Sequence, residues 1–318
     1  MTQGNTKTQS FSRFGIAFFV LLAVNTILQY GTQFVLSAVN PAILDHPAFI
    51  FVLSDVPLYF IALPICLAIL GKPENNSEIT RSRLPVSRFL LAIVISFGVT
   101  SIGNLLGTLL SQIFALVSGS EISNPLIDVM TESSPLLMFL ASVIIAPIGE
   151  ELIFRYIIIN RTRQYGEKFA IILSAAMFAA FHTNIFQIPY AFLVGLVFGY
   201  IYIKTGKIRY SILVHAIINF FGGFLATFLV QYFAEIPLDL SGFTTSDYIT
   251  FLLVVLIEFL YLAFLLGCAV TTIILSIIKL KNISLSDGME KINVFKSPFI
   301  MLFFALCLVL TILRIMLG

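Results

Sequence analysis

The chain has 318 residues, of which 59% are hydrophobic and only 11% are charged, with a net charge of +2 and a mean hydropathy of +1.03. A water-soluble protein carries about a quarter charged residues, so the composition excludes a soluble globular domain, and the small net charge gives no reason to expect nucleic acid as a partner. Long, unbroken apolar runs predict an all-α fold, a polytopic transmembrane helical bundle of about eight to nine spans.

Apolar segments of about 20 residues, the length that a membrane-spanning helix needs, follow one another along the whole chain. We predict spans at about 14–39, 48–71, 89–118, 135–159, 169–187, 188–203, 210–234, 249–278 and 297–317. The fifth and sixth share one uncharged run, which we divide near Asn184, Gln187 and Pro189 because these residues favour a turn. Cys66, Cys268 and Cys307 lie in apolar runs and are predicted to be core residues, with neither a disulfide nor a metal cluster.

The charges of the connections alternate in sign. Nearly all Lys and Arg residues lie in the N-terminal tail and after the second, fourth, sixth and eighth predicted spans, whereas the other connections carry acidic residues. By the positive-inside rule, this pattern predicts that the N-terminus is cytoplasmic and that the C-terminus lies on the opposite side of the membrane.

Three ionisable residues interrupt the fourth predicted span in the stretch APIGEELIFRY, residues 146–156. Such a side chain costs about 3 kcal/mol at bilayer depth unless it is paired or faces water, so each one is a candidate for function. Glu151 and Arg155 are four residues apart and can pair on one helix face. Glu150 lies about 100° away from Glu151 around the helix and is left without the arginine. One fixed and one free carboxylate would suit a reactive acid, and the alternative is a structural ion pair with an additional acid.

Two histidines lie in later predicted spans. His182 is in FAAFHTN, and His215 and Asn219 lie four residues apart in SILVHAIINFFGG, on one helix face. Each could simply make a hydrogen bond between helices. Together with Glu150, they form a set that can hydrolyse an amide bond. A carboxylate takes a proton from water, an imidazole holds or shares that proton, and imidazole and amide donors stabilise the oxyanion.

Two further acids lie within apolar segments. Asp55, in LSDVP, is predicted to be a helix N-cap near the outer interface. Glu258 lies within the eighth predicted span without an obvious partner. A functional Glu258 would favour an ion or proton pathway, so a proton-coupled transporter remains an alternative.

Three motifs occur in order on successive predicted spans: EELIFR fits EExxxR, FAAFH fits FxxxH and HAIIN fits HxxxN. In this order they resemble the CPBP family of intramembrane proteases, which includes type 2 CAAX prenyl proteases and bacteriocin-processing (Abi) proteins. The resemblance covers about residues 130–225. It implies a protease core at 130–225 between N-terminal transmembrane helices at 1–129 and C-terminal transmembrane helices at 226–318.

The resemblance also implies a role for each motif residue. Glu150 would activate water, and His182 would help to hold it. His215 and Asn219 would form the oxyanion pocket, while Glu151 and Arg155 would be supporting residues. The implied function is an intramembrane endopeptidase of the bacterial cytoplasmic membrane, in contact with membrane lipid. Its substrate would be a membrane-associated peptide or protein, either CAAX-like or a bacteriocin or leader sequence.

Other interpretations of the same residues remain open. Glu150, His182 and His215 form a set that could hold zinc with one open position. Because HExxH is absent and Asn219 suits an oxyanion role better, we favour a metal-free mechanism in which Glu150 is the base, without a cofactor. A non-proteolytic bacteriocin-immunity protein is a further alternative.

The predicted depths of the site residues differ. At ~1.5 Å per residue from the cytoplasmic helix ends, Glu150 lies about 15 Å, His215 about 8 Å and His182 about 20 Å into the membrane. These residues meet only if the helices tilt or if the fifth helix begins late.

Overall fold

The computed structural model describes residues 3–44, 47–72, 81–119, 122–124, 134–229, 244–279, 283–287, 293–294 and 297–317. Nearly all of these residues are helical, and the extended pairing among them is a single bridge between Gly166 and Asp287. The predicted all-α class is therefore confirmed. The predicted boundary at 129/130, the last residues of the predicted span 210–234 and most of the acidic connections lie outside the described residues.

The N-terminal part of the chain forms three long helical runs. They are α1 (Gln3–Val39), then α2 (Pro47–Val56) continued by η2 (Pro57–Ala62) and α3 (Leu63–Leu70), and then α4 (Val86–Ser118), with the short η1 (Pro41–Ile43) after α1. Asp55 is inside α2 and is not an N-cap, so that prediction is wrong. The pattern SDVP does not begin a helix here because the helix already runs from Pro47 and continues through Pro57 as η2.

The middle of the chain carries the three motifs. Its first helical run comprises α6 (Pro135–Met138), η3 (Phe139–Ile145), α7 (Ala146–Glu150), η4 (Glu151–Ile159) and α8 (Asn160–Thr162), followed by the short η5 (Arg163–Tyr165). The later helices are α9 (Glu167–Phe181), α10 (Gln187–Thr205), and α11 (Ile208–Asn219) continued by η6 (Phe220–Leu225). The C-terminal helices are α13 (Thr245–Lys279) and α14 (Pro298–Leu317).

Within the described residues, eight helical runs are long and apolar enough to cross a membrane. The predicted fifth span is the exception: α9 has 15 residues, or about 22 Å, against about 30 Å for the hydrocarbon core. It ends early because Thr183 has a φ of 48°, in the left-handed region. The Asn184 side chain then accepts a hydrogen bond from the backbone N–H of Phe186 and stabilises the turn. The predicted division of the run therefore falls at this turn.

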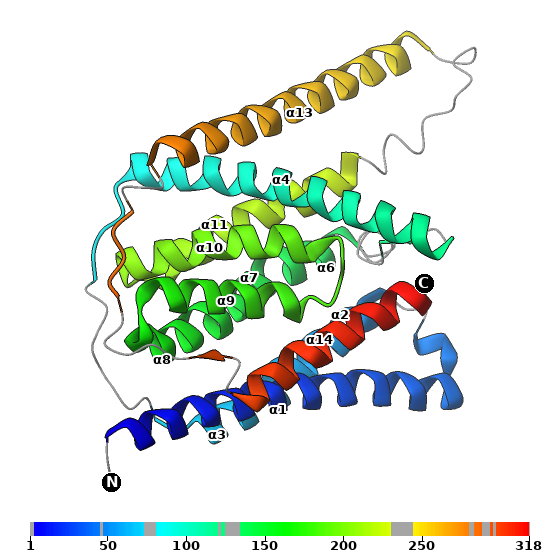
Figure 1. The fold of residues 1–318 in the computed structure, drawn as a ribbon. Coiled ribbons are helices and arrows are strands. Elements are labelled where there is room, and N and C mark those ends of the chain that lie inside the picture. Colours follow the sequence, from blue (N-terminus) through cyan, green and yellow to red (C-terminus); the bar gives the residue numbers. More distant parts are fainter. Residues whose placement is uncertain are drawn as a thin grey trace.

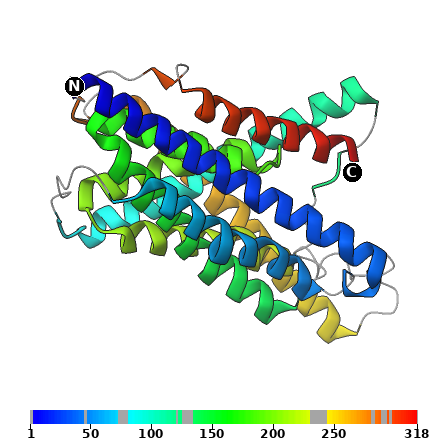
Figure 2. The same cartoon turned by 90° about the horizontal axis from the view of Figure 1, so that it is seen from below.

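The helices form layers (Figure 1). α13 lies on one face and packs on α4; α9, α10 and α11 lie in the middle; α14 and α1 lie on the other face. Seen from below, α1 runs between α14 and the α2–η2–α3 helix (Figure 2). The motif-bearing helices are therefore enclosed by the flanking ones. The start of α1 and the end of α14 lie at opposite ends of the bundle (Figures 1 and 2), while the cytoplasmic position of the N-terminus stays a prediction.

Apolar side chains cover both the interior and much of the outer surface. α13 buries only Cys268 and Thr272 among its described residues, and it exposes a row of large side chains that includes Leu252, Phe259 and Leu266. An apolar face of this length fits contact with lipid. All three cysteines are free and buried, as predicted.

Four helical segments are π-helical, with i→i+5 hydrogen bonding: η2, η3, η4 and η6. Such segments are rare and are frequent at functional sites. η2 begins at Pro57, whose missing N–H interrupts the normal hydrogen-bond ladder. The EExxxR motif itself passes from α7 into η4. The sequence pattern contained no signal for this geometry.

Candidate active site

The predicted ion pair within the fourth helical run forms. Glu151 Oε1 lies 3.3 Å from Arg155 Nη1, and both side chains are 0% exposed. The spacing of four residues brings the two groups together although the segment is π-helical. Removal of one partner of such a buried ion pair strongly destabilises the protein, because the other charge is then left uncompensated.

Aromatic rings surround the guanidinium of Arg155. Its Cζ atom lies 4.2 Å from the centroid of the Phe178 ring and 5.2 Å from that of the Phe198 ring, which are cation–π distances. Ser174, on α9, donates a 2.7 Å hydrogen bond to the Phe154 carbonyl, which fixes α9 against η4. Packing from α9 and α10 therefore holds Arg155 beside Glu151.

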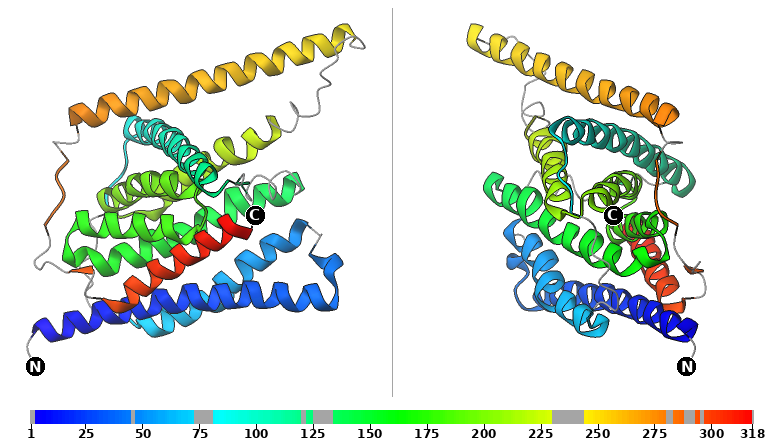
Figure 3. Two further views of the ribbon diagram at one scale, coloured as in Figure 1. Left: turned by 45° about the vertical axis from the view of Figure 1, so that its right-hand side comes forward. Right: turned by 90° about the vertical axis from the view of Figure 1, so that its left-hand side faces the viewer.

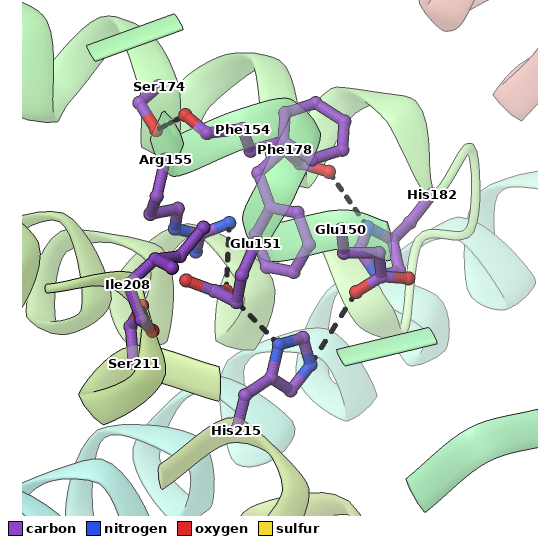
Figure 4. A network of polar contacts seen from close by, with 10 residues as sticks. All are labelled: Glu150, Glu151, Phe154, Arg155, Ser174, Phe178, His182, Ile208, Ser211 and His215. Carbon is purple, nitrogen blue, oxygen red and sulfur yellow. Dashed lines mark hydrogen bonds and ion pairs between the residues drawn. The ribbon is translucent and has the colours of Figure 1, made fainter. Parts of the chain in front are cut away.

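His215 connects the two glutamates (Figure 4). Its Nδ1 atom lies 3.1 Å from Glu151 Oε1, and its Nε2 atom lies 3.5 Å from Glu150 Oε2. Both ring nitrogens can donate hydrogen bonds only in the imidazolium form. The His215 ring also packs on Phe198 at a centroid distance of 4.9 Å.

The two glutamates differ in accessibility. The Glu150 side chain is 23% exposed, whereas that of Glu151 is 0% exposed. The residue spacing predicted this division into one acid fixed by Arg155 and one left without the arginine. It did not predict that His215 would contact both acids, because the residue spacing within one helix contains no information about a residue on another helix.

His182 lies at the end of α9, on the same side of the network as Glu150 (Figure 4). Its Nδ1 atom is 2.8 Å from the carbonyl oxygen of Phe178, and the two rings are 4.7 Å apart. When Nδ1 donates to this carbonyl, the neutral ring keeps Nε2 as an acceptor. Glu150 and His215 are both within electrostatic reach of His182.

Asn219 lies one turn beyond His215 on α11. Its Nδ2 atom donates a 2.8 Å hydrogen bond to the carbonyl oxygen of Ser142, in η3. Within the described residues, no hydrogen bond joins Asn219 to Glu150, His182 or His215. The amide therefore connects α11 to the helical run that carries the glutamates.

The charged motif residues meet although their predicted depths differed. α9 stops at the site instead of crossing the bundle, so His182 lies at a helix end. The α11–η6 helix and α4 are inclined to α9 and α10 (Figure 3). Gly103, on α4, allows close approach to α10, since a side chain there would collide with the backbone of Tyr190.

Several residues near the site were not identified from the sequence. Phe198 and Ser142 carry no motif, and their roles depend on contacts between helices.

Asp55, whose carboxylate accepts from the Ser54 hydroxyl at 3.4 Å, is within electrostatic reach of Glu150. Glu258 lies on α13, and among the described residues it makes no hydrogen bond or ion pair with the charged network.

The donors do not fit a zinc site as the structure arranges them. No group of three His, Cys, Asp or Glu side chains in the described part of the chain is arranged to hold a metal ion. Both nitrogens of His215 already face carboxylate oxygens, and Nδ1 of His182 faces a carbonyl.

A bundle of apolar helices that encloses a Glu–His–Glu–Arg network defines a multi-pass membrane protein with a buried polar site. Residues 132–221 match the family model of the Rce1-like type II CAAX prenyl endopeptidases. These residues are thus similar to the Rce1-like endopeptidases, which confirms the resemblance to the CPBP family for this part of the chain. This family consists of intramembrane proteases, and Glu150, Glu151, Arg155, His182, His215 and Asn219 all lie within the matched residues.

A bacterial relative shares part of this region. The chain is 32% identical over 96 residues to the UPF0177 protein YxdF of Lactococcus lactis subsp. lactis (strain IL1403). The match covers 30% of this chain and 52% of that protein, so the chain spans about half the length of this relative. No solved structure is significantly similar to the chain.

Proposed function

We propose that this protein is an intramembrane endopeptidase that hydrolyses a peptide bond of a membrane-associated substrate, with Glu150 as the base that activates water. The observation that carries the proposal is the contrast between two adjacent acids. Glu151 is sealed and paired with Arg155, whereas Glu150 is 23% exposed and touches His215. The Rce1-like match supports the class of reaction.

The reaction needs few groups. The Glu150 carboxylate takes a proton from water while the water oxygen adds to the carbonyl carbon, and the π electron pair of the carbonyl moves to its oxygen. The resulting oxyanion collapses, the C–N bond breaks, and Glu150 returns its proton to the departing nitrogen. The products are a carboxylic acid and an amine, and the base is regenerated.

The other motif residues orient Glu150 and stabilise the oxyanion. Glu151 and Arg155 hold His215 through its Nδ1 atom, and His215 Nε2 in turn orients Glu150. At 3.5 Å this last contact is long for a hydrogen bond, so the same N–H can turn to the oxyanion. Asn219 uses one N–H on Ser142 and keeps a second one for the same purpose. His182 helps to hold the water.

We propose a substrate segment that lies at the membrane, either CAAX-like or a bacteriocin or leader sequence. The site is in the bacterial cytoplasmic membrane, where lipid surrounds the apolar outer face. The Rce1-like match supports a CAAX-like peptide, and the Lactococcus relative supports a bacterial setting. No cofactor is required, because the proposed steps use only protein groups and water.

The alternatives have less support. A zinc-dependent version lacks a fitting donor set among the described residues. A proton-coupled transporter that uses Glu258 lacks a hydrogen bond or ion pair between this residue and the network in the part of the chain that the structure describes. A non-proteolytic immunity protein gives no account of the partly exposed Glu150 beside the buried ion pair.

The test uses the purified protein in lipid nanodiscs and two internally quenched peptides, one farnesylated at a C-terminal CAAX sequence and one an unmodified apolar leader peptide. We expect cleavage of at least one peptide, a loss of at least about a thousandfold in Glu150→Gln, and no loss in the control Glu258→Gln. Both variants should unfold at the wild-type temperature. Equal cleavage by wild type and Glu150→Gln, or no cleavage of either peptide, would contradict the proposal.

A further inference from the structure

A tyrosine from the second helical run reaches the site. Tyr59 lies in η2, and its ring and hydroxyl pack directly against Gly149, the residue before Glu150. A methyl group at position 149 would collide with both the ring and the hydroxyl. Glycine at this position therefore allows Tyr59 to approach the backbone that carries Glu150.

The hydroxyl of Tyr59 is free to bind a substrate. It makes no hydrogen bond within the described residues, and its oxygen is not sealed from solvent. Glu150 is within electrostatic reach of the phenol. A tyrosine hydroxyl at a half-buried position normally finds a partner, so an unpartnered hydroxyl beside a reactive acid points to a ligand.

The other polar groups near Glu150 each contact a protein group. His215 faces two carboxylates, and Asn219 donates to Ser142. Tyr190, a second tyrosine within electrostatic reach of Glu150, accepts a hydrogen bond from Gln187. Tyr59 differs from them because its hydroxyl has no hydrogen-bond partner at all among the residues that the structure describes, whereas Tyr190 and Asn219 each already hold one.

We propose that Tyr59 is a further catalytic residue, which donates a hydrogen bond to the oxyanion when water adds to the substrate carbonyl. This inference rests on the proposed function and assigns a residue of the N-terminal helices to that site. The phenol keeps its proton throughout. Negative charge grows on the carbonyl oxygen and the hydrogen bond shortens. The oxygen's electron pair then re-forms the C=O bond as the C–N bond breaks and its electron pair leaves with the nitrogen, which Glu150 protonates. A donor that strengthens as this charge develops lowers the barrier.

The experiment compares Tyr59→Phe with Tyr30→Phe, a matched change at an exposed tyrosine of α1, on the quenched peptide that the wild type cleaves. Tyr59→Phe should lower kcat by about 10²–10³-fold and change KM by no more than about twofold. Affinity for a phosphinate analogue of the same peptide, which mimics the tetrahedral intermediate, should fall by about the same factor as kcat. Tyr30→Phe should change neither quantity.

Gly149→Ala gives an independent test, because it displaces the phenol without removing it. We expect kcat to fall in Gly149→Ala, and the same change in a Tyr59→Phe background to have little further effect. Unchanged kcat in Tyr59→Phe, a change in KM alone, or equal losses from Gly149→Ala in both backgrounds would overturn the assignment. Cleavage that persists in Glu150→Gln would instead overturn the proposed base, while the kcat of Tyr59→Phe would still report on the phenol. A wild type that cleaves neither peptide would overturn both.

Discussion

Replacement of Arg155 by methionine should unfold the protein at much lower denaturant concentration. The guanidinium lies 3.3 Å from Glu151 Oε1, and both side chains are 0% exposed. With an effective dielectric constant of about 20, two unit charges at that distance attract by about 5 kcal/mol. Breaking a buried pair by removing one partner costs about 3–5 kcal/mol. Methionine is unbranched like the aliphatic stem of arginine but carries no charge. Most of the lost stability therefore reflects the uncompensated charge of Glu151.

The assay is reversible unfolding in mixed micelles, followed by circular dichroism. We expect the free energy of unfolding of Arg155→Met to be lower than that of the wild type by about 3–5 kcal/mol. Arg88→Met, on the exposed start of α4, should stay within about 0.5 kcal/mol of wild type. The double variant Glu151→Gln/Arg155→Met removes both charges and should recover about 2 kcal/mol relative to Arg155→Met. Additive losses in the double variant would refute the reasoning, because they would mean that the two charges do not stabilise each other.

Three further predictions concern the site and its supports. Asn219→Ala removes the 2.8 Å hydrogen bond to Ser142 and should lower the free energy of unfolding by about 1 kcal/mol in the same assay. A free energy of unfolding equal to that of the wild type would mean that the bond is not formed in solution. Gly103→Ala would place a methyl group against the backbone of Tyr190 and should cost about 1–3 kcal/mol, whereas Gly31→Ala, where nothing lies nearby, should not destabilise the protein. Cleavage should persist after the purified protein is stripped with a chelator, and loss of activity that zinc restores would contradict the metal-free mechanism.

Features that depend on neighbours within one helix could be predicted from the sequence. The apolar runs gave the helices, and the spacing of Glu151 and Arg155 gave their ion pair, which the structure contains. The difference between Glu150 and Glu151 followed from the same spacing. These predictions hold because residues four apart on a helix are neighbours whatever the rest of the fold does.

Features that depend on packing between helices could not be predicted. The contact of His215 with both glutamates requires α11 to pack against the glutamate-bearing run so that these residues lie at the same level of the bundle. The early end of α9 depends on the left-handed Thr183, a conformation that threonine rarely adopts. Asp55 looked like an N-cap from its local pattern, but the helix continues through Pro57 as η2.

Several residues of the proposed site lie in or directly beside π-helical segments. Tyr59 is in η2, Ser142 in η3 and Arg155 in η4, and η6 begins directly after Asn219. A π-helical turn changes the direction of the side chains that follow it relative to an α-helix, so each of these helices can be apolar toward lipid over most of its length and still turn a polar group inward at one level. Such segments are frequent at functional sites, and η4 begins directly after Glu150. In the proposed mechanism residues 1–129 contribute directly, because their second helical run supplies the Tyr59 side chain, which packs against Gly149, the residue before the proposed base.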